Sequence, residues 1–403
     1  MKKSLFILLI SFLLIISACS TENSTKKGNE LSGKSDIIDE STIENTTSDL
    51  DIIQGSNNID LYSKLDNAMT HFEKYHDFSG AVYVGIEGKE IYSRALGMAN
   101  HVQGTTNTLD TKFIMASLTK QFTAAAILLL EERGLLELDD QITNYLHGPT
   151  QWEGITIHHL LSMSSGIVND NHPKFTENFE KTFGSNIPFP LPTIEEAVAL
   201  FNDIPLNFKP GEKYEYSNSN YLLLGMIIEQ ISGDKYESFL GKNIFKPLGM
   251  LNSGYSVDWD VQDNKAIGYD KIRSENDLYP IQYDYFLTHS AGGLYTTIND
   301  LVTWDRALYS EKLFKKETIA KMYAPHTKIS SNSSYFGFEY GYGWFTKGNI
   351  VEHDGYIYGY RTNIYRELDS EFVIIILSNN ESIGWSNINN FTNILNKIVK
   401  GEW

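Results

Sequence analysis

The chain of 403 residues is long enough to bury a hydrophobic core without cross-links, and its single cysteine excludes any intramolecular disulfide. Lys and Arg number 33 while Asp and Glu number 51, so the formal net charge is −18. An acidic excess of this size repels phosphate backbones and anionic lipid headgroups, which argues against nucleic-acid binding. Solubility is the simplest explanation of the charge, ahead of steering of cationic substrates.

The first residues have the pattern of a secretory signal peptide. Two lysines precede an apolar run from Leu5 to Ala18, which is too short to span a membrane. The segment Ile16-Ser17-Ala18-Cys19 resembles the processing box of bacterial lipoproteins, and this resemblance implies cleavage before Cys19 and acylation of its sulfur. Residues 1–18 are therefore predicted to be removed, and the protein is predicted to be extracytoplasmic and anchored to the cell membrane through a lipid on Cys19.

Residues 19–58 predict a flexible tether, because they are rich in Ser, Thr, Asn, Asp, Glu, Lys and Gly and contain no aromatic residue. The folded domain is expected over residues 59–403. It begins with a predicted helix near Leu61 to Tyr75. Two predicted strands then form a hairpin around Gly88, at Ala81–Gly85 and Lys89–Tyr92.

Apolar runs of helical length then dominate from Ala116 to about Tyr323, with loops expected at residues 169–192 and 257–280. Near the C-terminus the pattern becomes strand-like again. The aromatic or β-branched segments lie at Tyr340–Phe345, Tyr356–Arg366 and Glu371–Ser378, and a helix is expected at about Trp385–Val399.

The simplest assembly of these elements is an α+β fold, an α/β/α sandwich. Its antiparallel sheet is built from N- and C-terminal segments and is flanked by the terminal helices. A mostly helical subdomain is inserted at about residues 112–335.

The first motif that carries chemistry is Ser117-Leu118-Thr119-Lys120, at the start of an apolar helix that is expected to end at Gly134. Residues at i and i+3 share one helix face, so the hydroxyl and the amine lie close together. Burial disfavours the charged form of a lysine, and a neutral amine can take the serine proton. The spacing alone is weak, because Ser24–Lys27 and Ser232–Lys235 also match it.

Two later segments supply candidate partners. Tyr216 and Asn218 are expected to project from a loop, where the phenol could relay protons and the amide could bond a substrate carbonyl; Tyr216 as a packing aromatic is the plainer alternative. His353 and Gly355 lie on or beside a predicted strand after a turn. The glycine would let substrate approach the strand backbone, while His353 by itself is as compatible with a structural role.

Together, Ser-x-x-Lys, Tyr-x-Asn 99 residues later and His-x-Gly a further 137 residues later resemble the signature motifs of serine β-lactamases and penicillin-binding proteins. The resemblance covers about residue 60 to the end. The Tyr-x-Asn element is similar to class C β-lactamases, DD-peptidases and related esterases. The third motif departs from the usual Lys-Thr-Gly, since His353 stands in place of the lysine and Asp354 follows it. A titrating imidazole in that place argues against efficient β-lactam hydrolysis.

The resemblance implies acyl transfer by Ser117, with Lys120 and Tyr216 sharing general-base and general-acid duty. It also implies substrate binding by Asn218, His353 and Gly355, and an oxyanion hole made of the backbone N–H groups of Ser117 and Tyr356. The expected substrates are D-alanyl-D-alanine peptides, β-lactams, D-alanyl esters of a wall polymer or small esters. The alternative is a penicillin-binding receptor or sink that is acylated without turnover.

No cofactor or metal is predicted. There is no His-Glu-x-x-His motif, the adjacent pair His158-His159 cannot both face one metal, and no glycine-rich phosphate loop is present. Arg361 could bind a substrate carboxylate, but a solvated surface arginine is the plainer interpretation. The sequence predicts no oligomeric state.

Overall fold

The computed structural model describes residues 56–184, 193–271, 278–281, 283, 288–331 and 333–403. The predicted signal peptide, Cys19 and most of the predicted tether lie outside these residues. Across the described part of the chain, no helix is both long enough and apolar enough to cross a membrane. Residues 60–403 form one compact unit.

An antiparallel sheet of eight strands forms the centre of this unit, with the spatial order β10-β11-β12-β13-β14-β15-β1-β2. The N-terminal strand β1 pairs with the C-terminal strand β15, from Gly80 opposite Ser378 to Gly85 opposite Val373. This pairing confirms the predicted sheet built from both ends of the chain. The strands are β1 (Gly80–Ile86), β2 (Lys89–Leu96), β10 (Thr327–Lys328), β11 (Glu339–Tyr340), β12 (Phe345–Lys347), β13 (Ile350–Ile357), β14 (Tyr360–Glu367) and β15 (Phe372–Ser378).

Helices cover both faces of the sheet because its central strands are apolar on both sides. Every residue of β15 is buried. The helices α2 (Ser56–His76) and α13 (Trp385–Val399) lie on one face, where Phe72 stacks on Phe391 at 3.9 Å between ring centroids, and α11 (Ile298–Ala307) lies on the other. Helix α2 begins at Ser56, inside the segment predicted as tether.

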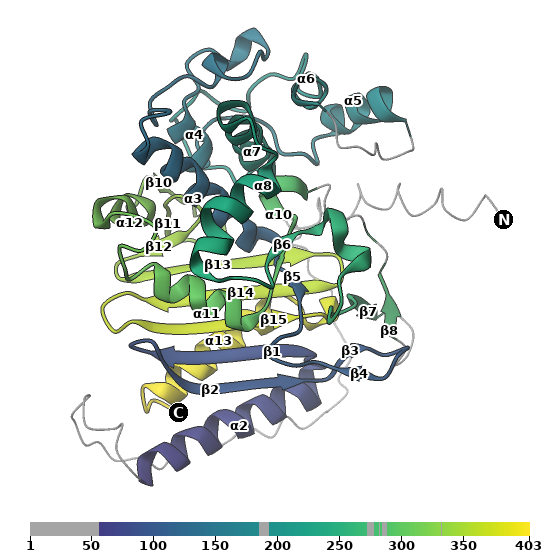
Figure 1. Cartoon of the computed structure of the whole chain (residues 1–403), viewed down its shortest axis with the longest axis vertical. Coiled ribbons are helices and arrows are strands. Elements are labelled where there is room, and N and C mark those ends of the chain that lie inside the picture. Colours follow the sequence, from purple (N-terminus) through teal and green to yellow (C-terminus); the bar gives the residue numbers. More distant parts are fainter. Residues whose placement is uncertain (1–55, 185–192, 272–277, 282, 284–287, 332) are drawn as a thin grey trace, which may run out of the picture. The chain divides into compact units, whose positions relative to one another are not determined.

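The segment between β2 and β10 carries the predicted helical insert, and its helices α4 to α7 lie beyond the β13 side of the sheet (Figure 1). Its longer helices are α3 (Thr119–Glu132), α5 (Pro173–Phe183) and α7 (Asn218–Ser232), and α12 (Lys316–Tyr323) precedes the late strands. The shorter helices are α4 (Ile157–Leu161), α6 (Ile194–Ala199), α8 (Tyr236–Leu240), α9 (Lys246–Leu248) and α10 (His289–Gly292). Short strands pair among themselves: β3 (Met98–Asn100) with β4 (Thr105–Thr106), β9 (Leu294–Thr296) with both β5 (Phe113–Ile114) and β6 (Gly254–Tyr255), and β7 (Tyr269–Lys271) with β8 (Leu278–Pro280).

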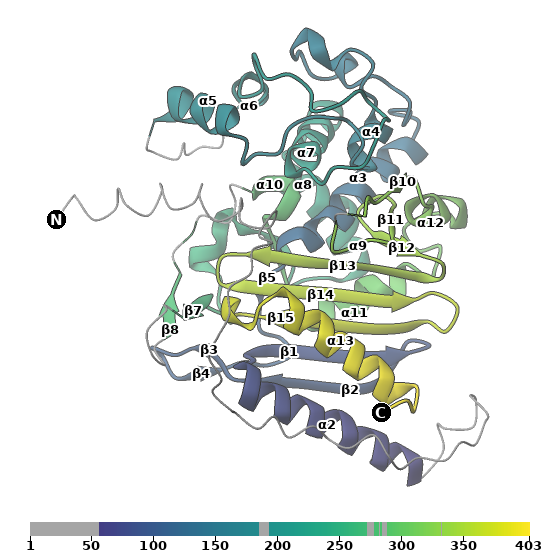
Figure 2. The same ribbon diagram turned by 180° about the vertical axis from the view of Figure 1, so that it is seen from behind.

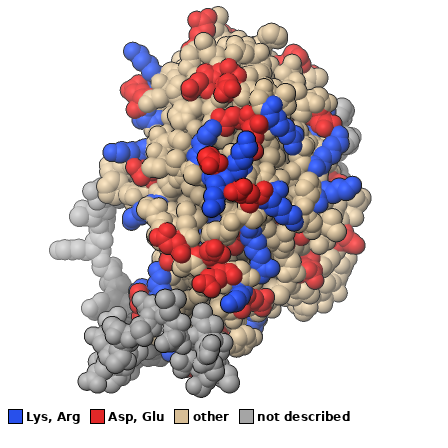
Figure 3. Space-filling model, turned by 60° about the vertical axis from the view of Figure 1, so that its left-hand side comes forward, with Lys and Arg blue, Asp and Glu red and all other residues tan. Residues whose placement is uncertain are grey.

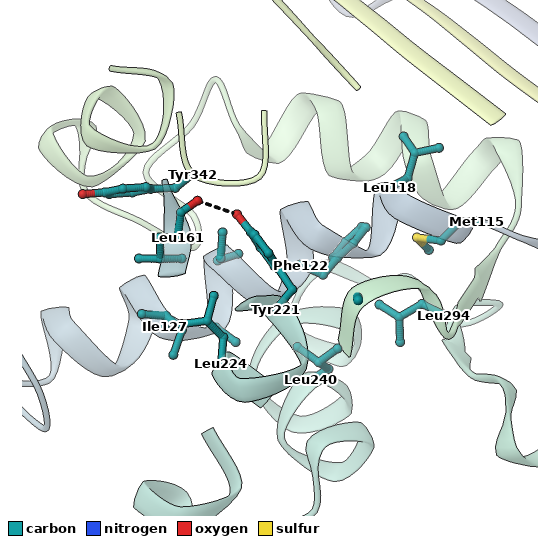
Figure 4. Close-up of a cluster of buried hydrophobic side chains, with 14 of the residues drawn as sticks. Met115, Leu118, Phe122, Ile127, Leu161, Tyr221, Leu224, Leu240, Leu294 and Tyr342 are labelled. Atoms are coloured by element: carbon teal, nitrogen blue, oxygen red, sulfur yellow. Dashed lines mark hydrogen bonds between the residues drawn. The ribbon is translucent and has the colours of Figure 1, made fainter. Parts of the chain in front are cut away.

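Helix α3 is the buried centre of the helical part. Its residues from Thr119 to Leu130 are all buried, and Gly134 follows its end with a φ of +68°, which suits a helix-terminating glycine. Figure 4 shows Phe122 and Ile127 of α3 packed near Tyr221 and Leu224 of α7, and the Tyr221 hydroxyl donates to the Leu161 carbonyl at 2.9 Å. The apolar run therefore forms the predicted buried helix.

Several predicted boundaries are wrong. The expected loop at 169–192 contains α5, which starts with a His172 side-chain cap and Pro173 and packs Phe175 inward. The expected loop at 257–280 contains β7, β8 and much of a 3₁₀ segment, Ser256–Val261. The expected strand at 340–345 is two strands, because Gly341 and Trp344 close a turn between β11 and β12. The expected strand at 356–366 contains a hairpin turn at Tyr358 and Gly359.

The charged side chains in Figure 3 are mixed, with Lys and Arg next to Asp and Glu over most of that face. The acidic excess is therefore not gathered there into one single-sign patch. This distribution agrees with a role of the charge in solubility.

Candidate active site

Ser117 lies in a 3₁₀ turn, Ala116–Leu118, that leads directly into α3. Its side chain is partly exposed, whereas Lys120, one turn further along, is completely buried. Ala116 holds a φ of +49°, which is unfavourable for a residue with a Cβ. The turn therefore presents the Ser117 hydroxyl at the surface of an otherwise buried segment, with backbone strain directly before the serine.

The structure brings the three predicted catalytic side chains together. The Ser117 Oγ lies 3.1 Å from the Lys120 Nζ and 2.9 Å from the Tyr216 hydroxyl. Lys120 Nζ also lies 2.9 Å from the Asn218 Oδ1 and 2.8 Å from the Ala291 carbonyl. Three separate parts of the chain thus meet around one hydroxyl and one amine.

Burial controls the protonation of this cluster. Desolvation lowers the pKa of Lys120 to about 7, against the opposing effect of the Asp170 and Asp354 carboxylates. Burial raises the pKa of Tyr216 well above its usual value, so its hydroxyl keeps its proton. Near neutral pH the amine can therefore accept a proton while the phenol can only donate one.

Helix α7 positions Tyr216 and Asn218 at its start. Asn218 is the first residue of the helix, not part of a loop as predicted, and its N–H donates to the Asn169 Oδ1 at 2.7 Å. Its side-chain amide faces Lys120 and, through Nδ2, the Asp170 carboxylate at 3.5 Å. These contacts place the amide inside the site, and its contact to a substrate carbonyl stays a prediction.

His353 lies in strand β13, as predicted, but its imidazole does not titrate near neutral pH. Its side chain is buried, its Nδ1 lies 2.6 Å from the Asp354 carbonyl, and its Nε2 lies 3.3 Å from the Tyr340 hydroxyl. Burial, followed by the nearby Lys120, lowers the pKa of His353 to about 3. The imidazole is therefore neutral across the physiological range and does not titrate as expected, because both nitrogens are held inside the protein.

Gly355 makes room for the serine turn. A Cβ at this position would lie 2.7 Å from the Met115 carbonyl, 2.2 Å from the Thr362 Oγ1 and 3.1 Å from the Ala116 Cβ. The close approach that the glycine permits is thus between β13 and the turn that carries Ser117. The predicted approach of substrate to the strand at Gly355 stays a prediction.

The β13–β14 register orients the Tyr356 N–H. The hairpin closes on Ile357 opposite Tyr360, so alternation makes Tyr356 opposite Arg361 a non-hydrogen-bonded pair. The Tyr356 N–H therefore points away from β14, toward the opposite edge of β13. Strand β12 pairs with this edge only as far as Glu352. Beyond Glu352 the serine turn packs against it. This direction suits a donor to an oxyanion beside Ser117.

We expect Gly355→Ala to damage both stability and activity. The added methyl group must displace the serine turn or Thr362, which costs about 1 to 3 kcal/mol of unfolding free energy by overpacking. Loss of the oxyanion geometry should lower kcat by about 10²-fold or more. Gly241→Ala is the matched control, because a Cβ there meets nothing within 4 Å. Equal thermal unfolding and equal kcat for the two variants would contradict this role of Gly355.

Arg361 is partly buried, and no ion pair joins it to a carboxylate among the residues that the structure describes. Its guanidinium stacks over the Tyr356 ring at 3.8 Å from the centroid, and its Nε is buried without a hydrogen-bond partner among the described residues. Burial lowers its pKa. The expectation of a solvated surface arginine is therefore wrong, and a role in carboxylate binding stays a prediction.

The two adjacent histidines have structural contacts. His158 Nδ1 lies 2.7 Å from the Tyr342 hydroxyl, and His159 completes a capping box with Thr156 at the start of α4. Both side chains are half-buried. Within the described residues, no group of three or more His, Cys, Asp or Glu side chains could hold a metal ion.

Sequence reasoning missed two groups that contact the site. Asp170 lay in a segment predicted as loop, and its partner Asn218 is 48 residues away. Ala291 contributes only a backbone carbonyl, which no side-chain pattern could indicate.

The antiparallel sheet made from both ends of the chain, its helical insert and the Ser117–Lys120–Tyr216 cluster beside β13 define the architecture of the β-lactamase and penicillin-binding-protein superfamily. The chain belongs to the β-lactamase family, whose model matches residues 65–397.

Individual relatives agree with this assignment. The chain is 29% identical to penicillin-binding protein 4* of Bacillus subtilis over 344 residues, which cover 79% of this chain and 72% of that protein. The solved structure of the octameric penicillin-binding protein homologue from Pyrococcus abyssi is similar with a TM-score of 0.73, 29% identity and coverage of 84% of this chain and 77% of the other. A penicillin-binding protein from Bacillus halodurans gives a TM-score of 0.69 at 26% identity, with 81% and 98% covered.

Proposed function

We propose that this protein is an extracytoplasmic, lipid-anchored hydrolase that forms an acyl-enzyme on Ser117 with a D-alanyl peptide, a D-alanyl ester or a β-lactam. One observation carries the proposal. The Ser117 hydroxyl lies within hydrogen-bond distance of both a buried lysine amine whose pKa is about 7 and a phenol that keeps its proton.

The acylation step follows from these protonation states. With Lys120 neutral, its lone pair takes the Ser117 proton while the Oγ attacks the substrate carbonyl carbon. The Tyr216 O–H supports the developing charge on the Oγ and can pass a proton to the leaving group, then regain one from Lys120. The leaving group departs protonated, the acyl group stays on Ser117, and a water molecule activated by the same amine later releases it as an acid.

The third motif supports a preference among the substrate classes. The buried and neutral His353 offers no positive charge for the carboxylate that every penicillin carries, and Asp354 adds a negative one. Peptides that end in D-alanyl-D-alanine carry a carboxylate in the same place, so D-alanyl esters suit this site better than either peptides or β-lactams as substrates for rapid turnover. Two related proteins from Bacillus species are named penicillin-binding proteins, which is consistent with acylation by a penicillin.

The predicted lipid anchor agrees with such substrates, because wall polymers lie outside the membrane. A lipid on Cys19 would hold the domain near them. Mass spectrometry of the purified lipoprotein would test the anchor, and an unmodified Cys19 in the mature protein would contradict it.

The proposal is tested by incubating the full-length protein with a penicillin and, separately, with a fluorophosphonate. We expect the intact mass to rise by one adduct that peptide mapping places on Ser117. A hydrolysis panel of a D-alanyl-D-alanine peptide, a D-alanyl ester, a small ester and a penicillin then ranks the substrates. Absence of an adduct with either reagent would contradict the assignment of Ser117 as the nucleophile. A penicillin adduct that is retained for hours, with no turnover of any substrate, would instead identify a penicillin-binding sink.

A further inference from the structure

The hydrogen-bond partners of Lys120 determine where its lone pair points. A neutral amine has two N–H bonds and one lone pair, and Lys120 Nζ has three neighbours within 3.1 Å. The Ala291 carbonyl can only accept a hydrogen bond. If the Asn218 group that faces the amine also only accepts, both N–H bonds are used and the lone pair faces Ser117.

The orientation of the Asn218 side chain is therefore critical. A carboxamide carries an acceptor oxygen and a donor NH₂ group of nearly the same shape, and it can turn either one toward a neighbour. With Oδ1 toward Lys120, the amide accepts from the amine at 2.9 Å. With Nδ2 in that place, an N–H bond would occupy the lone pair that must take the serine proton.

Asp170 distinguishes these two orientations. Its two carboxylate oxygens lie 3.5 Å from the Asn218 Nδ2, on the side of the amide away from Lys120. Burial raises the pKa of Asp170, while the hydrogen bond from Asn218 and the charge of Lys120 act in the opposite direction and favour the ionised form. An ionised carboxylate accepts hydrogen bonds and cannot donate them, so it attracts the NH₂ group and repels the amide oxygen. We propose that Asp170 is a positioning residue that holds the Asn218 oxygen on Lys120 and thereby directs the amine lone pair to Ser117.

The negative charge of Asp170 has a second effect, which is on the pKa of Lys120. The charged and titratable groups that face Lys120 are Asp170, Asp354, Tyr216, Tyr221 and His353. The two tyrosines and the histidine are neutral near pH 7, so the two carboxylates alone oppose the desolvation of the ammonium, and Asp170 has the larger effect. Removing its charge should lower the pKa of Lys120.

We therefore expect Asp170→Asn to change two features of the pH–rate profile of acylation. Loss of amide orientation should lower the plateau rate of acylation at high pH by about tenfold. Loss of the charge should move the acid limb of the pH–rate profile to lower pH, because the amine becomes neutral at lower pH. A residue that merely stabilised the fold would lower the fraction of active protein without moving the limb.

The experiment measures fluorophosphonate labelling of Ser117 against pH for the full-length wild type, Asp170→Asn, Asp170→Glu and the exchanged pair Asp170→Asn with Asn218→Asp. Asp170→Glu keeps the charge and should keep the acid limb. The exchanged pair restores an acceptor toward Lys120 and should regain part of the plateau lost in Asp170→Asn. The exposed Asp203, changed to Asn, is the control for the same chemical substitution.

The inference rests on the proposed function, and a second readout separates the two. In protein labelled with ¹³C at lysine Cε, titration of the Lys120 signal, assigned by its absence in Lys120→Met, reports the amine without any chemistry at Ser117. Failure of the fluorophosphonate to label Ser117 in the wild type would overturn the proposed function alone. An unchanged Lys120 titration in Asp170→Asn, or a plateau and an acid limb both equal to those of the wild type, would overturn the role of Asp170.

Discussion

Ser117→Ala should abolish turnover while leaving the fold intact. The partly exposed Ser117 hydroxyl is the nucleophile of the proposed acyl-enzyme, so its removal should lower kcat by a factor on the order of 10⁶ for every substrate that the wild type hydrolyses. Thermal unfolding should change little, because the side chain loses one oxygen at a half-buried site. Steady-state kinetics and thermal unfolding of the full-length protein measure both quantities.

Ser232→Ala is the matched control for this variant. Ser232 also stands three residues before a lysine, but it lies at the end of α7, where its hydroxyl accepts from the Asp234 N–H at 3.2 Å. We expect wild-type rates for this control. Turnover in Ser117→Ala within tenfold of the wild type would place the nucleophile elsewhere in the chain.

Lys120→Met should lower kcat/KM by about 10² to 10⁴-fold, the range that general-base catalysis contributes. Methionine retains an unbranched, buried chain but cannot accept the serine proton. For the wild type, kcat/KM should rise with pH through about 7, because the pKa of Lys120 is about 7 and only the neutral amine is a base. This acid limb should disappear from the residual activity of the variant.

Lys112→Met controls for the loss of a buried lysine. Lys112 is also buried, but it donates to Gln262 at 2.9 Å and to Asp263 at 3.0 Å, with no contact to the Ser117 cluster. The Lys112→Met variant should have a lower free energy of unfolding and should keep the acid limb of its pH–rate profile near pH 7. The base assignment would be wrong if Lys120→Met retained the wild-type pH profile.

Local sequence determined the elements whose contacts are close along the chain. The three-residue spacing puts Ser117 and Lys120 on one face, and the apolar run after them buries α3 because few of its residues could remain in water. The aromatic and β-branched segments near both ends predicted the sheet. The boundaries of the predicted strands were wrong where an apolar pattern continues through a turn. Tyr340–Phe345 and Tyr356–Arg366 each contain such a turn.

Only the tertiary structure decided which groups contact one another in the site and how they are protonated. Asn218 reaches Lys120 across 98 residues and Ala291 across 171, and neither contact follows from periodicity. His353 is neutral because packing closes around it, and Gly355 is required because β13 meets the serine turn. Spacing along a helix is fixed by its geometry, whereas the protonation and direction of a side chain depend on burial and on partners that only folding brings together.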